Sequence, residues 1–567
     1  MLASWIETAN LLHRCKQRWK DWGAEVTVAL GPIEFDEKII KRQLRRDLLD
    51  DWFPDPRLFE DMLDTNHVED ILIGNFQRND GTFKPEKRTL FNSPKNNFTL
   101  RYGLEISLAE RALYHALVAR LVPHYDRLIP WNVFNHRAPP NLDGRYLFGR
   151  AVKAWQDFTG VVRDGLSTAQ VLLSTDLTNY FENIDLEKLR ATLIDLLPEL
   201  AVEAAEKAAI RTHISTLFEC LKSWCYSERA GLPQNRDPSS FLANIYMLPV
   251  DRAMIGQGYR YFRYMDDIKI ACDSEHHARK ALKVLSLELR RRGLAVNSGK
   301  TEIVPVAMSE EIARCLDAGE AELQKIDSVW QTRSLRPISR TFPLLGDLTK
   351  RLLDEGRVSS RAFRYCIRRL EVLASCPEFE VPEAYFAAIT PLIIDALSKC
   401  PASTDVLVRY LRAVPTTDED LDRVAQLLQD ERRNYYSWQN YRLWMLLVQK
   451  NFNRPALVAY AMTVVRNEQD CATRCGATLY AGAFGSEDDR IEIAKGFGAL
   501  KSFMGQRVAL LAVQELRFEP NIRDHVGPHV RNDLKNVYRT LNRKGVYVAP
   551  PQPISITRIL DTERDYD

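Results

Sequence analysis

The chain has 567 residues, of which 45% are hydrophobic and 27% charged, so its composition is that of a globular protein with room for two or three domains. No apolar run reaches the length of a membrane span and no secretory signal precedes the first charged residues, so we expect a cytoplasmic protein without a membrane partner. The formal net charge of only +2 disfavours a general nucleic-acid-binding surface and predicts that any grip on phosphates is confined to a local channel.

The N-terminal part is predicted to be a helical extension over residues 1–80, followed by a basic segment and a helix. The basic segment reads Pro94-Lys-Asn-Asn-Phe-Thr-Leu-Arg101, with Lys95 and Arg101 near its two ends. A helix is predicted over residues 107–122, because apolar residues recur there at the three- and four-residue spacing of one helix face.

A single acid follows a strongly apolar run in the middle of the chain. Val171-Leu-Leu-Ser-Thr predicts a buried strand, and Asp176 stands at its C-terminal end. Phe181 comes five residues later, and Asp185 is a plausible N-cap for a helix that begins just after it. We therefore expect the chain to turn between Asp176 and this helix.

A Gly/Pro turn with a polar amide comes next. Gly231-Leu-Pro-Gln234 has the composition of a tight turn, and a helix with small residues on one side is predicted from Ser239 onward.

Two adjacent carboxylates, Asp266 and Asp267, separate two stretches of alternating bulky and charged residues. The alternation over 259–264 and 268–272 predicts a β-hairpin with the two acids at its tip. Like charges side by side repel each other, and a divalent cation would hold them together. A solvated acidic turn is the alternative for this motif taken alone.

After the hairpin, a helix is predicted over 276–292, with Gly293 marking its end. The following segment, Leu294-Ala-Val-Asn-Ser-Gly-Lys300-Thr301, carries a lysine that could serve as a general acid or as a point charge.

Beyond residue 345 the pattern becomes helical throughout, and no strand pattern is convincing. Thr417 and Ser486 are good N-caps, each with an acid three residues later. The recurring helices predict a HEAT-like α-solenoid of degenerate helical hairpins. The predicted helices cover 361–374, 382–398, 405–413, 418–432, 438–450, 455–465, 487–497 and 501–516.

Three of these motifs, in this order, resemble the palm of reverse transcriptases: an acid followed by aromatic residues, then Gly-x-Pro-Gln, then Tyr-Met-Asp-Asp. The resemblance implies an α+β fingers-palm polymerase domain with RNA-directed DNA polymerase activity. It also implies deoxynucleotides as substrates, an RNA template or a DNA product as partner, and Mg²⁺ as cofactor, with Mn²⁺ as the alternative.

The resemblance also assigns catalytic and metal-binding roles to three acids. Asp176 and Asp266 are the first choices as ligands of two metal ions, because hard cations prefer carboxylate oxygen. Asp267 is expected to have a lesser, supporting part, because successive side chains of a strand point to opposite faces.

Five further residues are implied in nucleotide binding. Phe181 corresponds to the aromatic that packs under the sugar and clashes with a 2′-hydroxyl, and Gln234 to the turn residue that contacts the template and the nascent base pair. Lys300, Arg101 and Lys95 correspond to residues that approach the phosphates. Residue 235 is asparagine where that family usually has glycine, which puts the tightness of the backbone approach in question.

A palm followed by helical repeats resembles the abortive-infection and defence-associated reverse transcriptases of bacteria. This implies antiphage defence, synthesis without a conventional template or primer (including priming on a protein hydroxyl) and a homo-oligomer. The predicted domains are the extension at 1–80, fingers and palm at 81–310, a connector at 311–345, the helical repeats at 346–545 and a tail at 546–567.

Two other functions compete with this one. The first is a retroelement enzyme that copies a dedicated non-coding RNA. The second, from a different class, is an inactive palm that acts as an RNA-binding scaffold, with the helical region as an interaction platform. The intact set of acids with Lys300 argues against the scaffold, because a palm without activity has no physical reason to keep clustered, mutually repelling carboxylates.

Overall fold

The computed structural model describes residues 28–29, 36–49, 51–63, 82–86, 88–139, 146–227, 229–316, 321–379, 381–468, 470–516, 518–541, 545–551 and 554. The chain divides into two compact units that interleave along the sequence. The first consists of the described parts of 1–51, 65–90 and 104–312, and the second of those of 52–64, 91–103 and 313–567. The predicted domain boundaries stay a prediction, and much of the predicted extension (1–27, 30–35, 50 and 64–80) and tail (552–553 and 555–567) lies outside the described residues.

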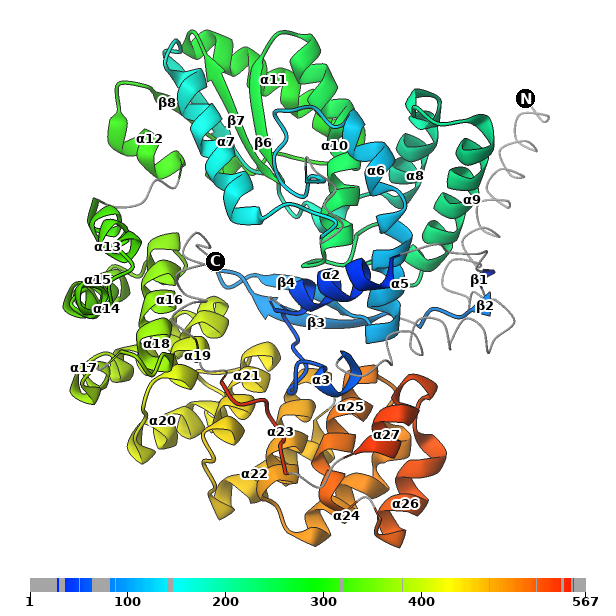
Figure 1. Ribbon diagram of the computed structural model, residues 1–567, viewed down its shortest axis with the longest axis vertical. Helices are drawn as coiled ribbons and strands as arrows, with labels where there is room; N and C mark the ends of the chain where they lie inside the picture. Colours follow the sequence, from blue (N-terminus) through cyan, green and yellow to red (C-terminus); the bar gives the residue numbers. More distant parts are fainter. Residues whose placement is uncertain are drawn as a thin grey trace, which may run out of the picture. The chain divides into compact units, whose positions relative to one another are not determined.

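The first unit contains a four-stranded antiparallel sheet with helices against it (Figure 1). Its order is β6 (Arg260–Tyr264), β7 (Asp267–Cys272), β5 (Val171–Thr175) and β8 (Glu302–Pro305). Every residue of β5 is buried, as expected for a strand that begins with an apolar run and lies between two others. The hairpin predicted from the alternating pattern is β6–β7.

Three helices pack on this sheet: α7 (Ala151–Leu166), α10 (Asp237–Gly256) and α11 (Glu275–Arg292). Helix α7 approaches β6 closely, because a Cβ at Gly165 would meet the ring of Phe262 at 3.1 Å. Leu285 and Leu289 of α11 share one hydrophobic core with sheet residues such as Ile270. Helix α11 ends at Gly293, whose φ of +80° favours glycine, as predicted.

The described part of the first unit contains five further helices between residues 37 and 221. Helix α5 follows Ser107, which forms a capping box with Glu110, so the predicted helix begins where expected and ends a turn earlier. Helix α8 begins after the N-cap Asp185, as predicted. The helices are α2 (Glu37–Leu49), α5 (Leu108–Ala119), α6 (Val122–Tyr125), α8 (Leu186–Asp195) and α9 (Ala204–Leu221).

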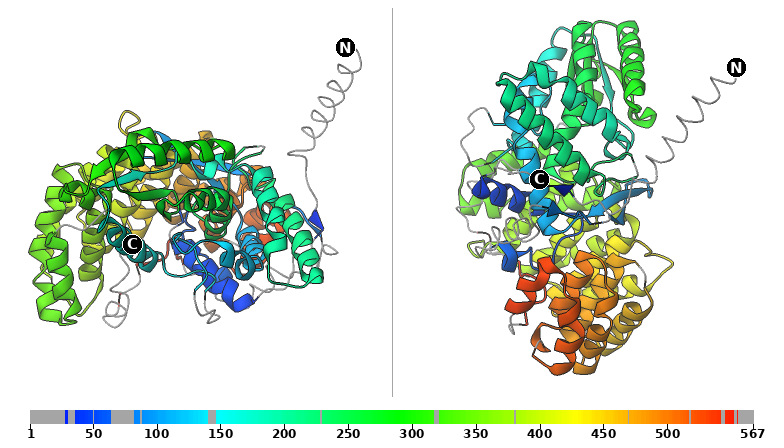
Figure 2. Two further views of the ribbon diagram at one scale, coloured as in Figure 1. Left: turned by 90° about the horizontal axis from the view of Figure 1, so that it is seen from above. Right: turned by 90° about the vertical axis from the view of Figure 1, so that its right-hand side faces the viewer.

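The second unit is helical beyond residue 321 in its described part, and Figures 1 and 2 show its helices from green to red. This confirms an all-helical C-terminal region, whereas a repeat remains a prediction. The helices are α13 (Ala321–Gln331), α14 (Leu335–Ser339), α15 (Phe342–Asp354), α16 (Arg361–Ser375), α17 (Glu383–Ala387), α18 (Thr390–Lys399), α19 (Thr404–Ala413), α20 (Asp418–Gln429), α21 (Ser437–Gln449), α22 (Pro455–Asn467), α23 (Cys471–Phe484), α24 (Glu487–Lys495), α25 (Phe503–Ala512), α26 (Pro520–Val526) and α27 (Lys535–Thr540).

These helices differ from the sequence prediction in several places, two of which are instructive. The predicted helix 382–398 is two helices, α17 and α18, and the second restarts with Pro391 in its first turn. Helix α23 was not predicted, because Gly476 and Gly482 suggest breaks. Both glycines instead allow close helix packing, since a Cβ at Gly476 would meet Trp444 of α21 at 2.6 Å and one at Gly482 would meet Ala512 of α25 at 2.4 Å.

Two N-terminal segments belong to the second unit. The hairpin of β3 (Thr89–Pro94) and β4 (Leu100–Glu105) contributes residues 91–103, and Gly103 leaves room for the ring of Phe91. In the segment 52–64, Asp55 and Asp61 form ion pairs with Arg507 of α25, at 2.7 Å and 2.6 Å. The side chains of Arg507 and Asp55 are 0% exposed, so this pair is part of the core of the unit.

In the part of the chain that the structure describes, no helix combines the length and the apolar character needed to cross a membrane.

Candidate active site

The predicted acids meet at one end of the sheet, where β5 ends beside the β6–β7 turn. Thr175, the last residue of β5, pairs with Ile268 of β7, so Asp176 follows directly beside the tip of the hairpin. Asp266 lies in the tip, and Asp267 is the first residue of β7. The strands that present Asp176 and the Asp266–Asp267 pair are therefore neighbours.

Asp266 stands among other carboxylates. Burial, then the nearby Asp176 and to a lesser degree Asp267, raise the pKa of Asp266 from 3.8 to about 6, against a backbone hydrogen bond and the charge of Lys300. The surrounding side chains thus leave negative charge at Asp266 incompletely compensated.

Lys300 is brought to the same place by the loop before β8. The turn η4 (Ser298–Lys300) follows Asn297, whose backbone N–H donates to the carbonyl of Asp176 at 2.7 Å, and the Lys300 ammonium forms an ion pair with the Asp176 carboxylate. Partial burial alone would lower the pKa of Lys300, but the hydrogen bond to Asp176 and the other carboxylates raise it above its usual value. Lys300 remains 65% exposed, so its ammonium can leave Asp176 for another anion.

The negative charge of Asp267 is neutralised by a lysine of the same strand. Lys269, two residues later and on the same face of β7, places its ammonium 2.7 Å from Asp267 and 2.8 Å from the Ser174 hydroxyl of β5. Lys269 is 4% exposed, so this pair is fixed by the sheet. The pair gives a physical reason for expecting a supporting part for Asp267, because its charge is neutralised within the protein.

The segments that carry Phe181 and Gln234 are joined to each other by hydrogen bonds. Phe181 begins the turn η2 (Phe181–Asn183), and its carbonyl accepts a hydrogen bond from Leu232 at 3.0 Å. The Gln234 amide donates to Glu182 in the same turn at 3.1 Å. The ring of Phe181 is partly buried, with its centroid 5.3 Å from that of Tyr180.

The turn that carries Gln234 has two residues with positive φ. Gly231 has φ +94°, and a Cβ there would meet the Cβ of Tyr226 at 2.4 Å, so glycine is required. Asn235 has φ +56°, in the left-handed region that asparagine tolerates better than most residues. Asn235 can therefore adopt the backbone conformation for which glycine is usually chosen.

Lys95 and Arg101 lie on the β3–β4 hairpin, which belongs to the second unit. The guanidinium of Arg101 lies over the ring of Trp52, 5.0 Å from its centroid, and Arg101 is exposed. Lys95 begins the tight turn of the hairpin, and its backbone carbonyl accepts a hydrogen bond from the backbone N–H of Phe98 at 2.8 Å. Both basic residues thus lie at or next to the turn of this hairpin.

The donor set at the end of the sheet fits a hard divalent cation. Asp176 and Asp266 offer oxygen ligands only, and their mutual repulsion would be relieved by a bound cation. Among the described residues, no three His, Cys, Asp or Glu side chains already stand in a metal-binding arrangement, and Lys300 takes one oxygen of Asp176. Two carboxylates, with nucleotide phosphates and water as further ligands, are the expected set.

The raised pKa of Asp266 leads us to expect a pH-dependent free energy of unfolding. Because its folded-state pKa is raised, the folded protein binds more protons than the unfolded chain between pH 4 and 6, and its free energy of unfolding falls as pH rises through this window. Asp266→Asn should therefore stabilise the metal-free protein by about 1–3 kcal/mol at pH 8, with the gain vanishing near pH 4. Thermal unfolding in EDTA at both pH values measures it.

A matched control is Asp273→Asn, an acid 69% exposed just beyond the other end of β7 and paired with Arg260. It should give no gain at pH 8. Addition of Mg²⁺ should raise the melting temperature of the wild type more than that of Asp266→Asn. Equal stability of wild type and Asp266→Asn at pH 8 would contradict the electrostatic picture of the site.

Several residues beside the site were not identified from the sequence, because they belong to no recognisable motif. Arg263, Asp251 and Asn244 are fully buried behind the hairpin tip, and Lys269 and Glu182 contact predicted site residues. Arg263 and Lys269 are charged residues in the interior of β6 and β7, whereas Arg260 and Asp267 stand at the strand starts. These interior charges are the signal that could have identified two of them, because buried charges need specific partners.

Residues 94–335 match the family described as reverse transcriptase (RNA-dependent DNA polymerase). The matched region contains the four-stranded sheet, the three acids and the turn with Gln234. The chain therefore contains a reverse transcriptase domain, and the protein is an RNA-directed DNA polymerase. No curated protein matches the chain.

Proposed function

Starting from this reverse transcriptase domain, we propose that Asp176 and Asp266 are the catalytic carboxylates of deoxynucleotide addition and that Asp267 supports them. The observation that carries the proposal is the crowding of Asp266 by Asp176 at the junction of β5 and β7. Partly buried acids that repel each other cost stability, and the divalent cations that the reverse transcriptase family uses would offset this repulsion.

The residues around the acids supply binding and orientation. Asp176 and Asp266 would hold the two Mg²⁺ ions, which activate the attacking 3′-hydroxyl and stabilise the leaving pyrophosphate when bound. The Lys300 ammonium would move from Asp176 to the nucleotide phosphates, where it would act as a general acid or as a positive point charge. Arg101 and Lys95 would bind the triphosphate as well, and Gln234 would contact the template and the nascent base pair.

We further propose that the enzyme acts in bacterial antiphage defence, with synthesis that needs no conventional template or primer. The support is the combination of a reverse transcriptase domain with a large all-helical C-terminal region. Stacked helices leave long surfaces free for self-association, and the near-neutral charge favours that over extensive strand binding, so a homo-oligomer is part of this proposal.

One experiment separates this function from its two alternatives. Purified full-length protein is incubated with labelled dNTPs and Mg²⁺, either alone, with bulk RNA, or with a primed RNA template, and the products are analysed with and without protease. Label that becomes attached to protein without added nucleic acid supports the defence-type enzyme. Incorporation that requires added RNA supports the retroelement alternative, and RNA binding without any incorporation supports the scaffold.

Light scattering of the same protein at micromolar concentrations tests the oligomer. The chain has a mass of 65.3 kDa, so a constant mass near this value would contradict self-association. Truncation after residue 345 is not a suitable test, because it would remove Arg507 and leave Asp55 without this ion-pair partner.

A further inference from the structure

A buried arginine lies directly behind the turn that carries Asp266. Arg263 is the fourth residue of β6, and its side chain is 0% exposed. Its guanidinium forms a two-point contact with Asp251 of α10, at 2.8 Å from Nε and 2.6 Å from Nη2. The side chain of Asp251 is also 0% exposed. This geometry is the strong, direction-specific form of the arginine–carboxylate contact.

Further hydrogen bonds hold this pair in one orientation. The Tyr261 hydroxyl donates to Asp251 at 2.8 Å, and the Arg263 Nη1 donates to the side-chain oxygen of Asn244 at 2.9 Å. The Asn244 amide in turn donates to the carbonyl of Asn135 at 2.6 Å. A fully buried ion pair has to be well satisfied to be tolerated, and such a pair often contributes more to orientation than to stability.

The same Nη1 of Arg263 also donates to the carbonyl oxygen of Met265 at 2.9 Å. That carbonyl and the N–H of Asp266 belong to one planar peptide group. A guanidinium that fixes the carbonyl therefore fixes the plane from which the Asp266 side chain departs.

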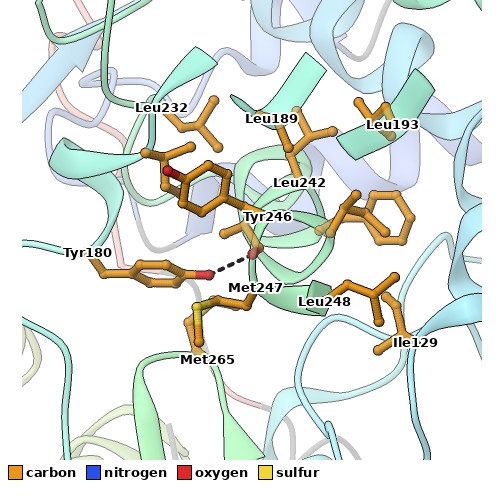
Figure 3. Close-up of a cluster of buried hydrophobic side chains, with 14 of the residues drawn as sticks. Ile129, Tyr180, Leu189, Leu193, Leu232, Leu242, Tyr246, Met247, Leu248 and Met265 are labelled. Atoms are coloured by element: carbon orange, nitrogen blue, oxygen red, sulfur yellow. Dashed lines mark hydrogen bonds between the residues drawn. The ribbon is translucent and has the colours of Figure 1, made fainter. Parts of the chain in front are cut away.

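Met265 needs this support because its backbone is strained. Its φ is +55°, a region that a long unbranched side chain seldom adopts without compensation from its surroundings. Its side chain is 6% exposed and extends towards Met247 and Tyr180 in the core (Figure 3). Tyr180 is itself fixed by a hydrogen bond from its hydroxyl to the carbonyl of Ala243 at 2.6 Å, drawn dashed in Figure 3. The turn is thus held by its side chain and by its carbonyl.

We propose that Arg263, oriented by Asp251, is a positioning residue that sets the place of the Asp266 carboxylate through the carbonyl of Met265. The inference rests on the proposed role of Asp266. Lysine cannot replace Arg263 here, because a single ammonium on a flexible stem cannot contact both oxygens of Asp251 and the Met265 carbonyl in one fixed geometry.

The test measures metal binding directly, without nucleotide. Mn²⁺ is titrated into full-length protein and its free concentration is followed by electron paramagnetic resonance. Arg263→Lys should raise the dissociation constant for Mn²⁺ about tenfold or more, which is the usual effect of removing a residue that orients a metal ligand. In polymerisation assays the same variant should need about tenfold more Mg²⁺ for half-maximal incorporation.

The matched control is Arg507→Lys in the second unit. Arg507 is also 0% exposed and contacts Asp55 at two points, but it belongs to a different core. It should lose thermal stability as Arg263→Lys does and keep the wild-type affinity for Mn²⁺. An equal loss of Mn²⁺ affinity in both variants would overturn the proposal, because the effect would then be general loosening.

Wild-type Mn²⁺ affinity in folded Arg263→Lys would also overturn the proposal. If Arg263→Lys does not fold, Tyr261→Phe decides, because it keeps the ring and removes only the hydroxyl bond to Asp251; we expect a rise of about threefold in the dissociation constant, and no change would count against the proposal. Absence of polymerisation by wild-type protein that binds Mn²⁺ normally would contradict the proposed function and leave this inference standing.

Discussion

Replacing Asp176 or Asp266 with alanine is expected to abolish deoxynucleotide incorporation while the fold persists. Each variant removes one of the two carboxylates that would hold the metal ions, and with it several kcal/mol of transition-state stabilisation. A loss on the order of a thousandfold or more in rate corresponds to that free energy. The fold should remain, because Asp176 follows the end of β5 and Asp266 lies in a turn, so neither contributes to the pairing of strands.

Two further substitutions calibrate this expectation, with labelled dNTP incorporation as the assay and thermal unfolding as the check on folding. Asp267→Ala should retain measurable activity, because the carboxylate it removes is already paired with Lys269. Asp273→Ala, at the exposed end of the same hairpin, should be as active as the wild type. Substantial polymerisation by folded Asp176→Ala or Asp266→Ala would contradict the assignment of the catalytic acids.

The strands on either side of the acids could be predicted, because local patterns determine them. The apolar run before Asp176 and the alternation around Asp266 correspond to β5, β6 and β7, and the capping residues Ser107 and Asp185 fix two helix starts. In each of these cases the signal lies within about ten residues, and the physical cause is equally local.

The division into units could not be predicted, because its causes are distant in sequence. Asp55 and Arg507 are 452 residues apart and form a fully buried pair. The hydroxyl of Tyr441 donates to the carbonyl of Pro54 at 2.6 Å in the same unit. Nothing in the local composition of residues 52–64 indicates that they join helices of the C-terminal half.

Asn235 shows how a departure from a family pattern can be compatible with the same backbone. The sequence alone puts the tightness of the backbone approach in question, since asparagine replaces glycine. The φ of +56° indicates what the position requires, which is a left-handed backbone rather than the absence of a side chain. At Gly476 and Gly482 the requirement is the opposite one. Both lie in a regular helix that any residue could adopt, and glycine is needed there because a side chain would not fit.

Replacing Phe181 with alanine is expected to weaken the choice of deoxynucleotides over ribonucleotides. If the Phe181 ring packs under the sugar of the incoming nucleotide, its removal leaves room for a 2′-hydroxyl, and the ratio of ribonucleotide to deoxynucleotide incorporation should rise about tenfold to a hundredfold. Incorporation of each nucleotide type is measured separately by competition between labelled dNTP and NTP.

The control is the neighbouring aromatic. Tyr180 is 3% exposed and donates to the carbonyl of Ala243, so Tyr180→Phe removes one buried hydrogen bond and should cost about 1 kcal/mol of stability without changing sugar choice. Phe181, in contrast, is only partly buried, with its ring next to that of Tyr180, and it belongs to the turn whose Glu182 contacts Gln234. An unchanged ratio in Phe181→Ala, together with a lower melting temperature, would mean that the ring of Phe181 is an ordinary part of the core, and that another residue discriminates between the sugars.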